Sequence, residues 1–299
     1  MREIFKGSGV ALVTPFNKEG KIDYEKLREL IDFQIQNKTD AIIICGTTGE
    51  SATLSENEHK KLIQECISHV NGRIPVIAGT GSNSTKTAIE LSKEAEKLKV
   101  DGLLIVTPYY NKPNQQGLFE HYTAIAKETK TPIILYNVPS RTGVNIHPTT
   151  VKKLLEENET IIAIKEASGN LEQIEALKEI KQKLNREFDI YSGNDDQTYD
   201  ILELGGIGVI SVVANILPKE THDMVIDYLN GNKEKSKEQQ IKMLKLIKEL
   251  FKTTNPIPVK KALELMKKIN GTLRLPLTEL EEENTKTLIK EMKNNGIVF

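Results

Sequence analysis

The chain has 299 residues, of which 41 are Lys or Arg and 42 are Asp or Glu, giving a formal net charge of -1. Such a balance lacks the long-range field that attracts phosphate polymers or anionic lipid, so we expect small-molecule partners and neither nucleic acid nor membrane. Cys45 and Cys66 cannot build a disulfide framework, and the first apolar run stops at Pro15, too early for a secretory leader. No apolar stretch reaches the ~18 residues that cross a bilayer, and a cytoplasmic protein is expected.

Eight short apolar runs recur along the chain, separated by charged segments of helical periodicity. Their continuous Val, Ile and Leu content is typical of parallel strands covered on both faces. The predicted strands are residues 9–13, 41–45, 74–79, 102–106, 132–136, 161–165, 188–192 and 208–213, and the predicted helices between them include 24–38, 56–70, 85–99, 117–130, 149–157 and 171–184. A doubly wound open sheet is the alternative, but eight consecutive βα units without a long crossover favour a closed (β/α)₈ TIM barrel.

The strand pattern stops near residue 232, and only helical patterns follow. We therefore predict a catalytic α/β barrel over residues 1–232 and an all-helical C-terminal appendage over residues 233–299. Its predicted helices are 234–252, 259–269 and 279–293.

Three helix starts carry local signals. Ser55 with Glu58 and Thr278 with Glu281 both have the spacing of a capping box, in which each side chain satisfies a free amide of the first turn. Pro148 precedes a helical segment, at a position where its missing N–H costs little.

The most informative side chain at the predicted carboxyl ends of the strands, where TIM barrels carry their active sites, is Lys165. It follows four apolar residues, and strict alternation places Ala163 and Lys165 inside the barrel, with Ile162, Ile164 and Glu166 on the other face. Burial would favour the neutral amine that attacks a carbonyl group, although an inward lysine could also be a structural ion-pair partner. Its isolation as the one lysine in a core strand favours Schiff-base chemistry.

Hydroxyl and guanidinium groups follow other strands. Tyr136, Thr47 and Thr48 lie at the right level to relay protons, although Tyr136 could simply pack. Arg141, one of six arginines, suits bidentate capture of a carboxylate but could be a surface residue. No histidine or carboxylate cluster follows a strand, so no metal site is expected.

Two further turns carry weaker signals. The GTTGE turn, residues 46–50, could hold a carboxylate in a nest of backbone amides, or could be an ordinary strand-ending turn. Tyr109 and Tyr110 form an exposed aromatic pair that a second subunit would cover.

Eight motifs are spread along the chain: GTTGESATL (46–54), RIPVIAGTG (73–81), VTPYYNKP (106–113), ILYNVPSRTG (134–143), IKEASGNL (164–171), GGIGVISVVAN (205–215), NPIPVK (255–260) and LRLPL (273–277). In these motifs the chain resembles the dihydrodipicolinate synthase family, within the superfamily of pyruvate-dependent class I aldolases and N-acetylneuraminate lyases. The resemblance runs almost end to end, and the combination of the fourth and fifth motifs is highly specific.

The resemblance implies condensation of pyruvate with L-aspartate 4-semialdehyde to 4-hydroxy-tetrahydrodipicolinate, the entry step of diaminopimelate and lysine biosynthesis. It implies a homotetramer built from two tight dimers, with no metal or organic cofactor. Lys165 matches the Schiff-base lysine. The residues that match other family roles are Thr47, Tyr110 and Tyr136 as proton relay, with Tyr110 reaching into the neighbouring subunit's site, Thr48 as a pyruvate-carboxylate contact, Arg141 as the receiver of the aldehyde's carboxylate, and Gly193 and Ile210 as backbone positions in the pocket.

The family also has members that lysine inhibits, and the chain resembles their effector site only in part. It matches at Ser51, Ala52, His59, Asn83 and Tyr109. Glu56 stands where those members carry His, and Thr87 stands where they carry Glu. The missing carboxylate at Thr87 predicts weak or absent lysine feedback.

Two other functions compete. N-acetylneuraminate lyase and sugar-acid aldolases share the lysine and the tyrosine, but Arg141 favours a short acidic aldehyde. A non-catalytic metabolite-binding barrel would not need a nucleophile, which argues against it.

Overall fold

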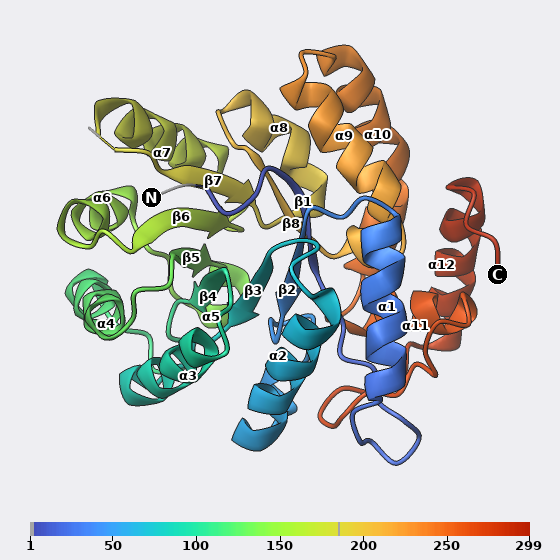
Figure 1. Cartoon of the computed structure of the whole chain (residues 1–299). Coiled ribbons are helices and arrows are strands. Elements are labelled where there is room, and N and C mark those ends of the chain that lie inside the picture. The colour runs from blue at the N-terminus through green and yellow to red at the C-terminus, as the bar shows by residue number, and fades with distance from the viewer. Residues whose placement is uncertain (1–2, 185) are drawn as a thin grey trace.

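Eight parallel strands close into a barrel in chain order, so the predicted TIM barrel is confirmed (Figure 1). The computed structural model describes residues 3–184 and 186–299. The strands are β1 (Gly7–Ala11), β2 (Ala41–Ile44), β3 (Val76–Gly79), β4 (Gly102–Val106), β5 (Ile133–Asn137), β6 (Ile161–Glu166), β7 (Asp189–Ser192) and β8 (Gly208–Ser211). Each strand begins within three residues of its predicted start. Small differences remain because an apolar run shows where a strand lies better than it shows where the strand ends.

Helices surround the barrel, and the six predicted between strands form with small shifts at their ends. They are α1 (Tyr24–Gln36), α2 (Glu56–Val70), α3 (Thr85–Lys97), α4 (Gln115–Glu128), α6 (Pro148–Glu157) and α7 (Leu171–Lys183). The structure adds α5 (Pro139–Thr142), α8 (Thr198–Glu203) and α9 (Pro218–Leu229). The three predicted C-terminal helices also form, as α10 (Lys233–Leu250), α11 (Ile257–Leu265) and α12 (Glu282–Asn294). Within the described residues, no helix combines the length and apolar character needed to span a membrane.

Two of the three predicted helix starts are confirmed. Ser55 and Glu58 form the reciprocal capping box of α2, and Pro148 is the first residue of α6. The box between Thr278 and Glu281 does not form, because α12 begins at Glu282 and its N-cap makes no side-chain bond.

Strand β6 departs from strict alternation. Ile133 of β5 pairs with Ile161, whereas the next residue, Ile134, pairs with Ala163, which leaves Ile162 as an extra residue in β6. Ile162 therefore packs in the barrel interior beside Ala163, and its predicted outward direction was wrong. Such a bulge resets the alternation locally, so the inward direction of Lys165 is unaffected.

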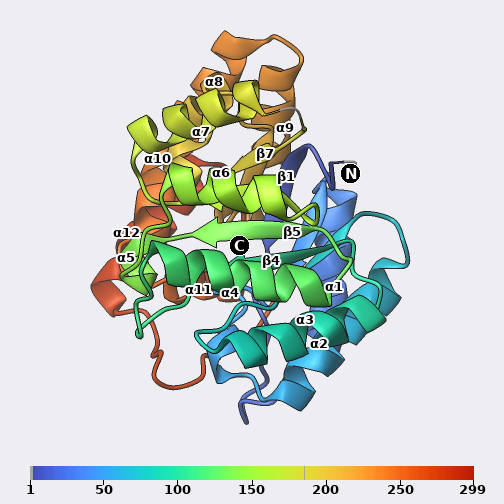
Figure 2. The ribbon, with the colours of Figure 1, turned by 90° about the vertical axis from the view of Figure 1, so that its left-hand side faces the viewer.

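The apolar side chains form two layers. An inner cluster fills the barrel and includes Ile43, Leu104 and Ile134. An outer cluster lies between strands and helices and also takes in Leu246 of α10 and Leu263 of α11. The C-terminal helices thus share the core that covers the barrel, and they lie at the end toward which the strands point (Figure 2).

A buried ion pair fastens the C-terminal region to the GTTGE turn. Lys260 Nζ of α11 lies 2.6 Å from Glu50 Oε1, and neither side chain is more than 1% exposed. The backbone N–H of Arg274 donates to the other carboxylate oxygen at 3.1 Å. Burial lowers the pKa of Lys260 to about 8, and the attraction of Glu50 opposes this lowering. Lys260 and Arg274 of the C-terminal region therefore hold the turn that carries Thr47 and Thr48 in place.

The side chain of Arg274 adds a second fastening. Its guanidinium makes a bidentate contact with Glu58 on α2 at 2.6 and 2.9 Å, and it donates to the carbonyl oxygen of Thr53 at 2.8 Å. The hydrogen bond from Arg274 lowers the pKa of Glu58 to about 2.

We expect Lys260→Met to lower the free energy of unfolding by about 3–5 kcal/mol, because it leaves the Glu50 carboxylate buried without its cation. The double variant Lys260→Met with Glu50→Gln removes both charges and should regain most of that loss. Urea unfolding followed by circular dichroism measures both. Equal losses in the single and double variants would contradict a stabilising ion pair.

Candidate active site

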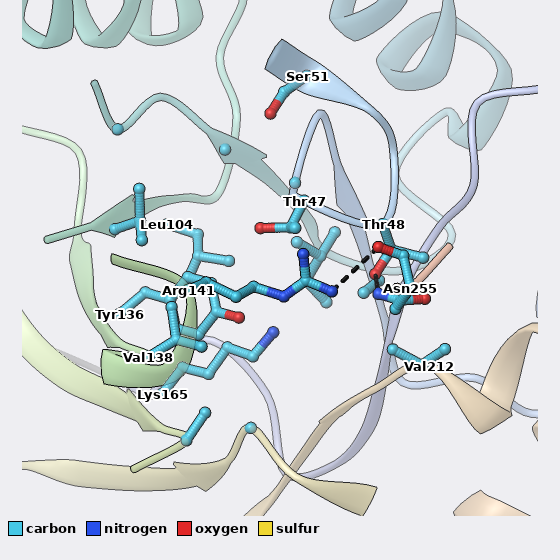
Figure 3. A pocket seen from close by; sticks show the side chains of 18 of the residues that line it. Thr47, Thr48, Ser51, Leu104, Tyr136, Val138, Arg141, Lys165, Val212 and Asn255 are labelled. Carbon is cyan, nitrogen blue, oxygen red and sulfur yellow. Dashed lines mark hydrogen bonds between the residues drawn. The ribbon is translucent and has the colours of Figure 1, made fainter. Parts of the chain in front are cut away.

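A cavity of about 150 Å³ opens at the carboxyl end of the barrel (Figure 3). Residues from the ends of several strands line it together with two from the C-terminal region, Phe251 and Asn255. The polar lining side chains are Thr47, Thr48, Ser51, Tyr136, Ser140, Arg141, Lys165, Asn194 and Asn255. The structure thus brings together seven residues that the sequence singled out: Lys165, Tyr136, Thr47, Thr48, Arg141, Gly193 and Ser51.

Lys165 projects from β6 into this cavity and is 5% exposed. Its Nζ lies 4.2 Å from the ring centroid of Tyr136, and the side chain makes no ion pair within the described residues. Burial lowers the pKa of Lys165 to about 7, with an attraction from Asp195 that raises it and a repulsion from Arg141 that lowers it further. Near neutral pH a large share of this amine is therefore uncharged and nucleophilic.

Asp195 is the buried carboxylate that acts on Lys165 through space. Its Oδ2 accepts hydrogen bonds from the backbone amides of Val212 and Val213, both at 3.0 Å, and its Oδ1 has no hydrogen-bond partner in the part of the chain that the structure describes. Burial raises the pKa of Asp195, and these hydrogen bonds oppose the rise. Asp195 was not predicted as a site residue, because nothing in its local sequence pattern indicates a role.

Tyr136 lies on β5 directly opposite Lys165 in the strand register. Burial raises the pKa of Tyr136, whereas Arg141 and the Thr47 hydroxyl lower it. The phenol, the Thr47 hydroxyl and the Lys165 amine all face one cavity, so protons can pass between them and a bound molecule.

Gly193 follows β7 where the backbone passes close to Lys165. A Cβ at this position would lie 2.7 Å from the Cβ of Ala167 and 3.1 Å from the Cε of Lys165. Its N–H donates to the carbonyl oxygen of Glu166 at 2.7 Å. A larger residue would press on Ala167 and on the Lys165 side chain, so the site favours glycine here.

Asn255 connects the two groups that the sequence assigned to carboxylate binding. Its Nδ2 donates to the Thr48 hydroxyl at 2.9 Å, and its backbone carbonyl accepts from Arg141 Nη2 at 3.0 Å (Figure 3). The Oδ1 of Asn255 is buried and has no hydrogen-bond partner among residues 3–184 and 186–299. Asn255 was not predicted as a site residue, because it lies far along the chain from the other polar lining residues and the turn that it begins, NPIP, is also typical of an ordinary helix start.

Two predicted site residues lie away from this cavity wall. Ile210 is buried in the barrel interior on β8, and Val212 lines the cavity instead. Tyr110 is 89% exposed, with a left-handed backbone at φ 72°, and it contributes nothing to the cavity of its own chain.

The predicted effector residues gather beside the active site. A groove of about 490 Å³ is lined by Ser51, Ala52, Glu56, His59, Thr87 and Tyr109, together with Thr47 and Arg141. Asn83 is outside this lining, and its carbonyl oxygen accepts a hydrogen bond from Asn111.

His59 takes a structural contact within this groove. Its Nε2 donates to the carbonyl oxygen of Gly79 at 2.8 Å, and burial lowers the pKa of His59, which keeps the ring neutral. Among residues 3–184 and 186–299, no group of three His, Cys, Asp or Glu side chains has the arrangement of a metal site.

A closed (β/α)₈ barrel with a buried amine facing a cavity at its carboxyl end has the construction of a lysine-dependent aldolase. The model of the dihydrodipicolinate synthetase family matches residues 4–295, and the chain belongs to this family. It is 55% identical over 295 residues to a 4-hydroxy-tetrahydrodipicolinate synthase of Clostridium tetani, covering 99% of each chain.

Solved structures agree with this membership. The dihydrodipicolinate synthase of Thermotoga maritima is 44% identical, with a TM-score of 0.97, over 99% of this chain and all of the other. A chloride-inhibited dihydrodipicolinate synthase of Acinetobacter baumannii in complex with pyruvate is also 44% identical, with a TM-score of 0.95, over 99% of this chain and all of the other.

We expect Lys165 to be methylated by formaldehyde and cyanoborohydride faster than surface lysines near pH 7, because only the neutral amine reacts. Below pH 7 protonation should slow the reaction about tenfold per pH unit, and above about pH 8 the rate should level off. Mass spectrometry of the peptide that contains Lys165 measures this profile. A rate that keeps rising well above pH 8 would indicate an ordinary lysine.

Proposed function

We propose that this cavity condenses pyruvate with L-aspartate 4-semialdehyde to 4-hydroxy-tetrahydrodipicolinate, with Lys165 as the Schiff-base nucleophile. The reaction is that of the family to which the chain belongs, and it is the entry step of diaminopimelate and lysine biosynthesis. The observation that carries the assignment of Lys165 is its position: a buried amine with a pKa of about 7, facing the cavity beside a phenol.

The first half of the reaction activates pyruvate. The neutral Lys165 amine adds to the C2 ketone, and the resulting carbinolamine loses water to give an iminium ion. The positive nitrogen then withdraws electrons, so a proton leaves the C3 methyl group and an enamine forms. These steps need only a nucleophile and proton carriers, and we propose that neither metal nor organic cofactor takes part.

The second half forms the new bond. The enamine C3 attacks the aldehyde carbon of the semialdehyde, whose oxygen takes up a proton and becomes a hydroxyl group. The amino group of the same substrate then adds to the iminium carbon and displaces Lys165, which closes the ring. We assign proton transfer to Tyr136 and Thr47, whose side chains face Lys165 across the cavity, and to Tyr110 of the partner subunit.

Two groups are assigned to the substrate carboxylates. Thr48 takes the carboxylate of pyruvate, since Asn255 donates to its oxygen and leaves its own O–H free to donate to the substrate. Arg141, at the exposed side of the cavity, takes the carboxylate of the semialdehyde. Gly193 and Ile210 contribute backbone groups to the pocket, Gly193 at the cavity wall and Ile210 one layer deeper.

We propose a homotetramer built from two tight dimers as the working form. Tyr109 is 38% exposed and Tyr110 is 89% exposed, and an aromatic pair of this kind is typical of a covered subunit interface. Both cysteines are free buried thiols, and the cytoplasm is the proposed compartment.

Borohydride trapping tests the proposed nucleophile. Treatment of the enzyme with pyruvate and borohydride should reduce the iminium ion and leave a stable adduct on Lys165, and Lys165→Met should give none. Mass spectrometry of the digested protein locates the adduct. An adduct on another lysine would refute the assignment of Lys165 but not the activity.

The substrate assay separates this function from its alternatives. The purified enzyme should consume pyruvate and aspartate semialdehyde together. Cleavage of N-acetylneuraminate without turnover of that pair would assign the chain to the lyase branch of the superfamily, and binding of pyruvate without an adduct would favour a binding protein.

We expect lysine to bind weakly or not at all in the groove beside the site, because Thr87 supplies no carboxylate for the ligand's ammonium group. Isothermal titration calorimetry should detect no tight binding, and Thr87→Glu should strengthen binding about tenfold by adding one charged contact. Tight lysine binding to the unmodified enzyme would overturn this prediction and would point to Glu56 as the replacement.

A further inference from the structure

Glu166 and Asn137 stand directly behind the two side chains assigned to catalysis. Glu166 follows Lys165 on β6, and Asn137 follows Tyr136 on β5. The strand register pairs Tyr136 with Lys165 and, one step on, Asn137 with Glu166. Because side chains alternate across a strand, the second pair faces the helices while the first faces the cavity.

The Glu166 carboxylate is fully buried, and three N–H groups donate hydrogen bonds to its two oxygens. Asn137 Nδ2 lies 3.1 Å from each of its oxygens, Gln173 Nε2 donates to one at 3.0 Å, and the backbone N–H of Ser168 donates to the other at 2.7 Å. Burial raises the pKa of Glu166, but the bonds from Ser168, Asn137 and Gln173 favour its charged form. The number and direction of these donors indicate a carboxylate held as the anion.

Asn137 is fixed on its other side as well. Its Oδ1 accepts from the backbone N–H of Ile146 at 3.1 Å, and its Nδ2 also lies 2.7 Å from Asn145 Oδ1. Asn145 in turn donates to Gln173 on α7 at 2.7 Å. A continuous polar network therefore joins the carboxyl ends of β5 and β6 to the loop before α6 and to α7.

No member of this network touches the cavity, so it cannot bind substrate. We propose that Glu166 and Asn137 are positioning residues that fix the Tyr136 phenol relative to the Lys165 amine. The inference rests on the proposed roles of Lys165 and Tyr136. Lys165 and Tyr136 are the chain neighbours of Glu166 and Asn137, so the network fixes the backbone from which both side chains project. A displacement of about 1 Å between reacting groups can cost about 10²-fold in rate.

Glu166→Gln is the informative variant, since it keeps the size of the side chain and replaces one accepting oxygen by an NH₂ group. That group faces the donors of Asn137 or Gln173, so attraction becomes repulsion. We expect kcat to fall by about tenfold or more while KM for pyruvate changes by less than about threefold. The pH profile should keep its pKa near 7, because the burial of Lys165 and its neighbours Asp195 and Arg141 are unaltered.

A double-mutant cycle with Tyr136→Phe separates positioning from general structural support. If Glu166 acts by aligning the phenol, Glu166→Gln should cost less than about threefold in kcat once that hydroxyl is absent. Full additivity of the two losses would overturn the inference. If Tyr136→Phe alone retains full activity, the phenol takes no part in the proton relay. The inference that the network positions this phenol is then overturned.

Asn158→Ala provides the matched control. Asn158 is a buried amide at the opposite end of β6, where it donates to the carbonyl oxygen of Leu154 and the hydroxyl of Thr123. This variant should lower the melting temperature but leave kcat within about twofold. A comparable loss of kcat would show that any weakening near β6 has this effect and would overturn the inference. If Glu166→Gln does not fold, Gln173→Met removes one donor and should show the same non-additivity at smaller size.

Discussion

The chemistry proposed for this barrel depends most on the exclusion of water from one lysine, Lys165. A closed parallel barrel has no free edge, and its interior is filled by apolar side chains up to the level of Lys165. An ammonium ion at that depth loses hydration that the protein replaces only in part, through its attraction to the carboxylate of Asp195. The same burial that would destabilise a structural lysine therefore supplies a reactive one. The chemistry proposed for the cavity follows from this loss of hydration, since burial favours the uncharged amine and a carbonyl carbon accepts electrons only from that form.

The site is completed by parts of the chain that follow the barrel. Glu50 lies in the turn that carries Thr47 and Thr48, and its charge is balanced by Lys260 of α11. Asn255, just before α11, contacts Thr48 with its side chain and Arg141 with its backbone. The C-terminal region, which follows α9, thus contacts the active site as well as the outer core.

Much of this arrangement could be predicted from the sequence, because it depends on local periodicity. The eight apolar runs gave the barrel, and alternation gave the inward direction of Lys165. The bulge at Ile162 could not be predicted, since it depends on how β6 pairs with β5 and leaves no mark in its own sequence. Asn255 and Asp195 were missed for a related reason: their roles arise from contacts between remote segments. The proposed capping box at Thr278 failed because spacing alone does not decide where a helix starts.

The tether of Arg141 to Asn255 has a consequence for variation at this position. The guanidinium is held by a main-chain carbonyl, which every amino acid possesses, whereas the Thr48 hydroxyl is held by the asparagine amide itself. Exchange of residue 255 during evolution would therefore release the Thr48 hydroxyl and leave the Arg141 guanidinium in place. Under the proposed assignment, binding of pyruvate and binding of the semialdehyde can thus change independently, although a single residue contacts both groups.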